Sequence, residues 1–184
     1  MLDGQVVAAI IVEIKTQLGY YGITNADLRV ARGDQPTSQF AGAASGTKKY
    51  QVFISPVAPE QIGWSRQYSR LDDNNMNLKV THTKQKSYQI SCLVDFDPSN
   101  PDDIPAHDLA QVINDMLQQP DSVRTLRDKG VFVHECQPVR PAFVVNQADN
   151  YESMPNFDMI ISYNAEYVKP VVAVTDATLE TNRV

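Results

Sequence analysis

The sequence predicts an α+β domain in which an antiparallel sheet packs against helices, with a projecting β-hairpin arm and an extended C-terminal tail. Apolar residues recur with helical spacing near the N-terminus and again after residue 105, and they alternate with a period of two in most of the stretches between and after. No internal repeat interrupts this order, which is typical of the α+β class. At 184 residues, the chain fits one domain, with the arm at 64–86 and the tail at 169–184.

The first predicted element is a helix over residues 6–18. Its apolar residues form one stripe of period 3.6: Val6, Val7, Ile10, Ile11, Ile14 and Leu18. Asp3 is expected to cap the start of this helix, and Gly19 is expected to end it. Because the polar face carries only Glu13, Lys15 and glutamines, packing in the core is favoured over binding to a membrane surface.

Two strands and a loop are predicted next. Leu28–Ala31 indicates a short strand, and Tyr50–Val57 indicates a buried strand that Pro56 and Pro59 end. The small polar residues 37–47 between them indicate a loop. Its two glycines lack the spacing of a phosphate-binding loop, so no nucleotide site is predicted there.

Residues 64–86 are predicted to form a long β-hairpin arm. Aromatic and basic residues alternate with Ser and Gln in the first limb, an Asp-Asp-Asn-Asn turn follows at 72–75, and the second limb, 78–86, is mostly Thr, Lys and Gln. An isolated two-stranded hairpin is marginal in water. We therefore expect the arm to become ordered against a partner; the alternative is that it extends the sheet of its own subunit.

The remaining elements complete the sheet and its cover. They are a strand at 88–96, a helix around 109–117, a short helix from Pro120 to Lys129, strands at 131–139 and 157–168, and the polar tail. Asp103 and Pro105 mark the start of the longer helix, and Gly130 marks the end of the shorter one.

Composition excludes several functional classes. With 16 basic and 22 acidic residues, the formal net charge of −6 argues against tight binding of duplex DNA or RNA, which depends on Lys and Arg. No apolar run approaches the roughly 18 residues of a membrane span. Cys92 and Cys136 lie in apolar stretches and are expected to be small buried hydrophobes of an intracellular protein. No metal or cofactor site is predicted.

The best catalytic candidate is the pair Asp95 and Asp97 at the end of an apolar strand. Their spacing resembles the aspartate pair of phosphoryl-transfer enzymes of the haloacid dehalogenase type, in which one carboxylate attacks and the other moves the proton. Here Pro98-Ser99 follows in place of Gly-Thr, and the strand lies in the middle of the chain. The three histidines belong to no nucleophile or metal motif. A solvated turn is therefore favoured, and no catalytic residue is predicted.

Charge is segregated along the chain. Residues 48–86 hold seven basic and three acidic residues, whereas residues 95–121 hold seven aspartates and no Lys or Arg. Opposite blocks in one small domain favour docking or subunit pairing, although a solvated face is the usual alternative. The predicted interface residues are Trp64, Arg66, Tyr68, Arg70, Lys79, Lys84, Lys86, Asp102, Asp103, Asp108 and Asp115.

Short segments of the C-terminal third form a recognisable pattern. They are Pro141-Ala142-Phe143-Val144-Val145-Asn146, Tyr151-Glu152, Asp158, Ile160, Tyr163-Asn164 and Lys169-Pro170-Val171-Val172. This pattern resembles the neck or tail-terminator proteins of tailed bacteriophages. The helix-then-strand block 106–139 and the strand ending in Ser55-Pro56 are similar to that family as well, so the resemblance extends over most of the chain.

The resemblance implies a structural virion protein and not an enzyme. Such a protein forms a ring, typically of six copies, at the head–tail junction, where it terminates the tail tube and leaves a channel for DNA. Its partners would be further copies of the chain, a head-side connector or adaptor protein and the tail-tube protein. DNA would pass without specific binding, and no membrane or cofactor would be involved. The location implied is the neck or tail of the virion, after assembly in the host cytoplasm.

Two alternatives remain at this point. One is another virion ring protein, such as a head-completion adaptor or a tail-tube subunit. The other is a small α+β enzyme or ligand-binding domain, which a convergent polar pocket would favour.

Overall fold

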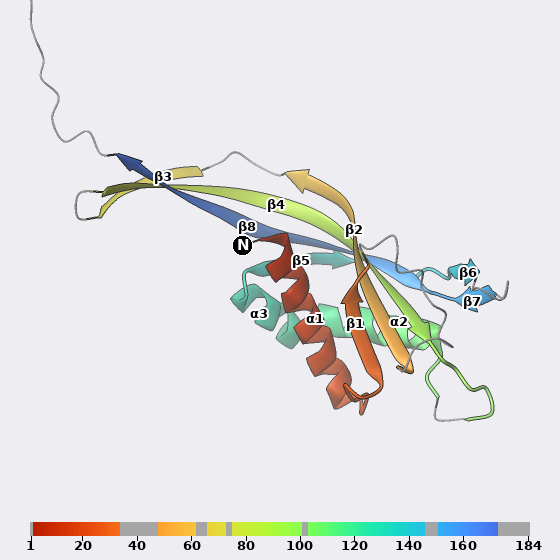
Figure 1. Ribbon diagram of the computed structural model, residues 1–184. Helices are drawn as coiled ribbons and strands as arrows, with labels where there is room; N and C mark the ends of the chain where they lie inside the picture. The colour runs from red at the N-terminus through yellow and green to blue at the C-terminus, as the bar shows by residue number, and fades with distance from the viewer. Residues whose placement is uncertain are drawn as a thin grey trace, which may run out of the picture.

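A computed structural model describes residues 2–33, 48–61, 66–72, 75–100, 103–145 and 151–172 (Figure 1). Within these ranges the elements are α1 (Asp3–Tyr20), β1 (Leu28–Arg32), β2 (Tyr50–Gln61), β3 (Arg66–Asp72), β4 (Asn75–Val94), α2 (Ala106–Gln118), α3 (Pro120–Asp128), β5 (Val131–Cys136), β6 (Phe143–Val145), β7 (Tyr151–Ser153) and β8 (Asn156–Val172). The predicted loop at 37–47 and the tail beyond residue 172 lie outside the described residues.

The main sheet has the strand order β1-β2-β4-β8-β5, and β3 pairs with β4 beside this path. β1 runs parallel to β2, whereas the other pairs of this sheet are antiparallel. The α+β class is confirmed, with one parallel pair in a sheet that the sequence predicted as antiparallel. β6 and β7 form a separate small hairpin.

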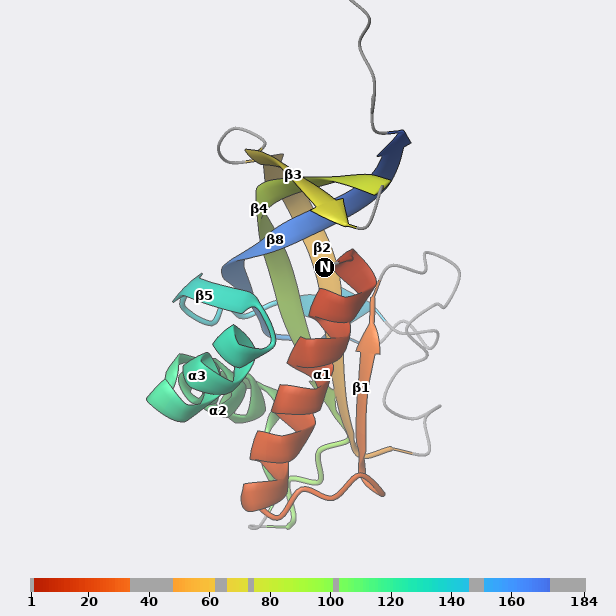
Figure 2. The same cartoon turned by 90° about the vertical axis from the view of Figure 1, so that its left-hand side faces the viewer.

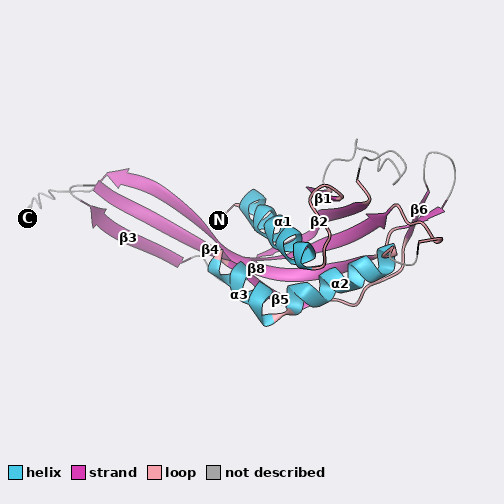
Figure 3. Cartoon of the chain, turned by 90° about the horizontal axis from the view of Figure 1, so that it is seen from below, coloured by secondary structure: helices cyan, strands magenta, loops and turns pink. Residues whose placement is uncertain are grey.

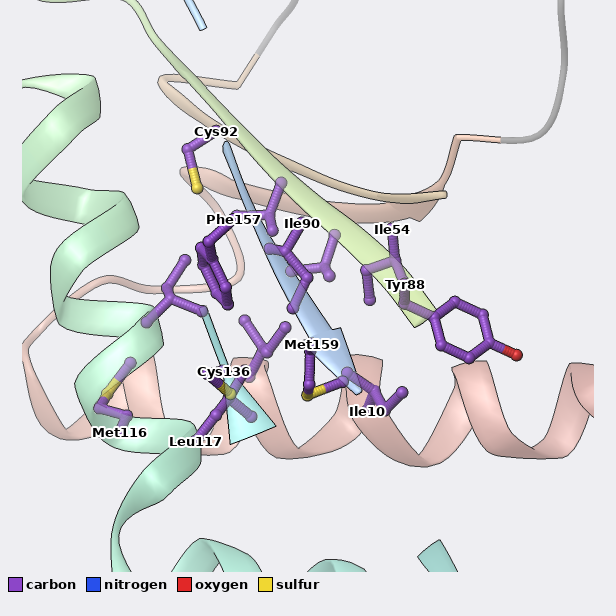
Figure 4. Close-up of a cluster of buried hydrophobic side chains, with 14 of the residues drawn as sticks. Ile10, Ile54, Tyr88, Ile90, Cys92, Met116, Leu117, Cys136, Phe157 and Met159 are labelled. Atoms are coloured by element: carbon purple, nitrogen blue, oxygen red, sulfur yellow. The ribbon is translucent and has the colours of Figure 1, made fainter. Parts of the chain in front are cut away.

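The core lies on one face of the sheet, where α1, α2 and α3 pack (Figure 2). Ile10 of α1, Ile90 of β4 and Phe157 of β8 point into this layer and are fully buried (Figure 4). Removal of these side chains from water stabilises the fold, and the period-two pattern in each strand is what places them on one face. A smaller cluster of Phe53, Leu93 and Met154 forms apart from this core.

Helix α1 confirms the predicted stripe but not the predicted ends. Its N-cap is Leu2 and Asp3 is the first helical residue, because the Asp3 carboxylate is occupied by partners from the sheet. The helix continues through Gly19 to Tyr20, and the left-handed residue after it is Gly22, with a φ of +79°. Gly22 therefore supplies the stop that the sequence assigned to Gly19.

The prolines of β2 do not end the strand, contrary to the prediction. β1 pairs with β2 only as far as Ile54, and among the described residues no strand pairs with β2 on that side beyond it. A proline is tolerated at such an edge because its missing N–H is not needed by a neighbour. The register shifts between Pro56 and Ala58, which places a bulge there, and pairing with β4 then continues to Gln61.

The arm is three-stranded and extends the sheet of its own subunit. β4 is one continuous strand of 20 residues, where two separate segments were predicted, and β3 pairs with its first half. β8 pairs with the same part of β4 as far as Asn75↔Val172. The sequence did not reveal this because β8 was expected to end near Val168. The arm projects past the helices (Figure 3), and Lys169–Val172 belong to strand β8 and not to the tail.

The second half of the chain follows the prediction closely. α2 and α3 occupy the expected segments, and Gly130, with a φ of +78°, follows α3. Pro105 is the N-cap of α2. β5 ends at Cys136 and not at Val139, because the backbone N–H of Gln137 turns to the carbonyl of Asp158 and Pro138 has no N–H to donate.

Both cysteines are free and buried, as predicted. Burial raises the pKa of the Cys92 thiol far above its usual range. Burial, with a smaller effect of the Glu135 charge, raises the pKa of Cys136 to about 12. Neither thiol is therefore a ready nucleophile at neutral pH.

Candidate functional site

The root of the arm is tied to the start of α1 by a polar cluster. One carboxylate oxygen of Asp3 accepts a hydrogen bond from the Lys86 ammonium of β4, and the other accepts one from the Tyr163 hydroxyl of β8. Burial acts to raise the pKa of Asp3, but the hydrogen bonds from Lys86 and Tyr163 outweigh it and the net pKa is lower than usual. Burial and the bond to Asp3 together raise the pKa of Tyr163. One carboxylate thus joins a helix to the two longest strands.

Beyond this cluster, the described part of the arm is held by side-chain pairs between β4 and β8. Lys79 forms an ion pair with Glu166 at 2.9 Å, and the Thr83 hydroxyl donates to the Asn164 amide oxygen at 3.0 Å. Lys79 and Lys86, both predicted interface residues, are therefore paired within the subunit. A surface ion pair such as Lys79–Glu166 contributes at most about 1 kcal/mol.

The acidic block also has a partner within the subunit. Asp103 forms an ion pair with Lys49, and its carboxylate accepts hydrogen bonds from the backbone N–H of Asp97 at 3.0 Å and the side chain of Asn100 at 2.9 Å. The bond from Lys49, followed by that from the Asp97 backbone, lowers the pKa of Asp103. The basic and acidic blocks that the sequence separated thus meet at Lys49 and Asp103.

The other predicted interface residues are spread over the molecule. Asp108 and Asp115 are exposed on α2, where Asp115 accepts a hydrogen bond from Gln111 at 2.9 Å. Lys84 is half-buried on β4. Arg66, Tyr68 and Arg70 lie in β3, in register with Thr81, Lys79 and Asn77. Trp64 and Asp102 lie outside the described residues.

The two aspartates that the sequence offered as catalytic candidates lie in a turn. Asp95 and Asp97 are both exposed, and the Asp97 carboxylate accepts the backbone N–H of Ser99 at 2.9 Å, which is the geometry of an Asx turn. They line a polar cavity of about 450 Å³ whose wall includes Lys49 and Asp103, and these two side chains already neutralise each other.

A second cavity lies beside the start of α2. Its volume is about 400 Å³, and its lining includes Leu93, Val94, Phe96 and Pro105 together with His107. Its lining also includes Asp95, Glu152 and Ser153, so titratable and hydroxyl side chains lie among the apolar ones. Among the described residues, no group of three or more His, Cys, Asp or Glu is arranged to hold a metal ion.

The sequence patterns did not predict that β8 supplies the third strand of the arm. Tyr167 and Val168, near the end of this strand, are 49% and 63% exposed, and the Tyr167 ring meets the His82 ring edge to face at a centroid distance of 5.9 Å. The signal was present in the apolar residues that continue from Tyr167 to Val172.

A family model for the E217 gateway protein gp29 matches residues 5–173 of the chain. The chain belongs to this gateway-protein family. The match places it among the structural proteins of the phage head–tail assembly, the broader class that includes the neck and tail-terminator proteins which its C-terminal pattern resembles. No curated protein matches the chain.

The family match covers the arm of this gateway-family protein as well as its core. It extends from α1 through the arm strands to β8, so the arm is part of the matched fold and not an appendage. Within the described residues, no helix is long and apolar enough to cross a membrane.

The Asp3 cluster predicts an acid-sensitive contribution to stability. The folded-state pKa of Asp3 is below its usual 3.8, so the contribution is present above about pH 4 and is lost as the pH falls through the lower folded value. Asp3→Asn should destabilise the gateway-family protein by about 1 kcal/mol or less at pH 7, because the carboxylate is partly exposed. The difference from the unmodified chain should shrink as the pH falls through the lowered folded-state pKa of Asp3. Urea unfolding at a series of pH values measures it, and an equal difference at every pH would contradict the assignment.

The turn formed by Asp95 and Asp97 predicts tolerance to substitution. Asp95→Ala and Asp97→Ala should each leave assembly intact. Asp97→Ala should cost about 1 kcal/mol or less of stability, because it removes the turn hydrogen bond from the Ser99 N–H. Phage complementation, with urea unfolding of the purified variants, tests this. Lost assembly in a fully folded variant would reopen a catalytic or metal-binding interpretation of the turn.

Proposed function

We propose that this protein forms a homo-oligomeric ring, with six copies as the expected number, that terminates the tail tube and joins it to the head-side connector. The family match over residues 5–173 carries the proposal. Further copies of the chain, a connector or adaptor protein and the tail-tube protein are the proposed partners, and the neck or tail of the virion is the proposed location.

The arm supports an assembly role. A three-stranded extension beyond the helical cover costs conformational entropy and adds little core, so a partner surface is its simplest use. A ring needs a head-to-tail contact between two different patches. The basic residues of β3 and the exposed aspartates of α2 are two such patches of opposite sign, and we assign them as complementary.

The charge of the protein suits a channel through which DNA moves. The net charge is −6, and DNA affinity depends on the number of phosphates that Lys and Arg neutralise. A ring of acidic subunits lets DNA pass without specific binding. A non-enzymatic role is part of this proposal, and the match to the gateway-protein family supports it.

The proposed ring makes a direct structural prediction. Electron microscopy of virions labelled through this protein should show a ring with an open lumen at the head–tail junction, and native mass spectrometry of that assembly should give its copy number. A ring along the whole tail would identify a tail-tube subunit, and a ring bound to the head alone would identify a head-completion adaptor. A strict monomer in the virion would overturn the proposal.

Charge reversal on β3 tests the proposed contact. The double variant Arg66→Glu/Arg70→Glu should weaken assembly, more at low salt than at high salt, because salt screens charge–charge attraction with a screening length of about 10 Å at 0.1 M. The melting temperature of the monomer should stay nearly unchanged. Arg124→Glu/Arg127→Glu on α3 makes the same change in charge away from the arm and is the matched control. Normal assembly of the β3 variant, or unfolding of its monomer, would contradict the contact.

A further inference from the structure

Between the core and the arm, the sheet narrows to two strands. The pairing of β2 with β4 ends at Gln61↔Lys84. The pairing of β3 with β4 begins at Arg66↔Thr81. Four residues of the chain, 62–65, therefore correspond to only two residues of β4, and this edge cannot stay in one register. Figure 1 shows β4 and β8 side by side between the end of β2 and the start of β3.

The other edge of this two-stranded ribbon loses its neighbour at the same level. β5 begins at Val131, which pairs with Tyr163 of β8. The strand cannot start earlier along β8, because the chain enters it from α3 through Gly130, whose φ is +78°. Within the described structure, β8 is thus paired beyond Tyr163 with β4 alone.

We call the narrow part the waist of the sheet. It consists of His82 and Thr83 of β4, in register with Ala165 and Asn164 of β8. The Thr83 hydroxyl donates to the Asn164 amide oxygen at 3.0 Å, which ties the two strands together. A two-stranded ribbon twists more than a wider sheet and is only marginally stable by itself. Bending of the sheet is therefore concentrated at the waist.

The arm beyond the waist is a wider and stiffer unit. β3, β4 and β8 pair there as three strands, and β3 follows β4 over all seven of its residues without a register shift. The ion pair between Lys79 and Glu166, at 2.9 Å, links β4 to β8 within this unit. Three paired strands resist deformation better than two, so the arm should move as one body.

Helix α1 is tied to the sheet on the core side of the waist. The Asp3 carboxylate binds Lys86 of β4 and Tyr163 of β8, and Tyr163 directly precedes the waist. The cover of this sheet face ends at the same level, because Ala165 is 3% exposed and Tyr167 is 49% exposed. Asp3 therefore holds both strands at the point where they leave the core.

We propose that the arm pivots as one unit about the waist, and that the Asp3 carboxylate holds it in the orientation of this structure. Moving the arm away from α1 pulls Lys86 and Tyr163 from one carboxylate, so both hydrogen bonds are lost together. Hinges of this kind consist of a few residues between two stiffer bodies. A pivoting arm can adjust its angle to a partner without refolding. This property belongs to the single chain and goes beyond the proposed ring.

Distances between two spin labels in the free chain test the pivot. One label is attached at Gln111→Cys on α2 and the other at Val168→Cys on the arm, and both positions are exposed. The native Cys92 and Cys136 are buried and leave the labelling to the new thiols. Labelled chains are diluted with unlabelled chain, so that only distances within one chain are measured. Asp3→Ala should broaden the 111–168 distance distribution by several ångströms.

Matched controls separate a pivot from a general loss of structure. Asp108→Ala removes a carboxylate from the first turn of α2, as Asp3→Ala does from α1, and should leave the distribution unchanged. Labels at Gln111→Cys and Glu135→Cys both lie in the core and should keep their distance in every variant. Asp3→Asn keeps an acceptor for Tyr163 and should broaden the distribution less than Asp3→Ala. No broadening with Asp3→Ala, equal broadening with Asp108→Ala, or broadening within the core would overturn the proposal.

Hydrogen exchange determines whether the arm moves as one unit. In Asp3→Ala the backbone amides of the waist should exchange several-fold faster, whereas those of β3 and of the paired segment 75–81 of β4 should keep their rates. Faster exchange along the whole arm would show that it unfolds and does not pivot, and would overturn the proposal. Both measurements use the free chain, so the absence of a ring from the virion would overturn the proposed function and leave the pivot standing.

Discussion

The pairing of β4 with β8 is the constraint on which the rest of the structure depends. It runs from Ser91↔Asn156 to Asn75↔Val172 without a register shift, and it belongs to the core at one end and to the arm at the other. Because side chains alternate along both strands, one register determines which residues meet the helices and which remain outside. The strands β2, β3 and β5 then attach along this ladder, and α1 is fastened to it by the carboxylate of Asp3.

The sequence predicted correctly those helices and strands that are determined by the pattern of their own residues. The stripe of α1, the helix around Leu109 and Met116, and the period-two strand around Ile90 are local patterns that burial confirms. The predictions were wrong where a residue's structure depends on a partner far away in the sequence. Pro56 is tolerated because β1 has already ended, and Asp3 does not cap α1 because Lys86 and Tyr163 bind its carboxylate. The length of the arm was underestimated for the same reason, since its third strand comes from the end of the chain.

The interface residues were harder to predict than the fold. Counting charges separated a basic block from an acidic one, but the fold brings Lys49 to Asp103 and Lys86 to Asp3, so part of each block is neutralised within the subunit. Which charged side chains stay available for a partner therefore depends on where the fold places them, and a count of charges along the sequence cannot give it. The chain belongs to the gateway-protein family, a structural family, so the surfaces left over after these internal pairs are the ones to examine for contacts with other proteins.

The long antiparallel ladder also has a mechanical consequence. β4 begins at the tip of the arm and ends in the core, whereas β8 begins in the core and ends at the tip. Tension between Val172 at the tip and Val94 in the core would slide the two strands past each other, and their hydrogen bonds lie perpendicular to that direction. The bonds would therefore share the load and break together, whereas a force that peels the strands apart breaks them one at a time. The antiparallel ladder therefore resists a force along the arm better than a force that peels its strands apart.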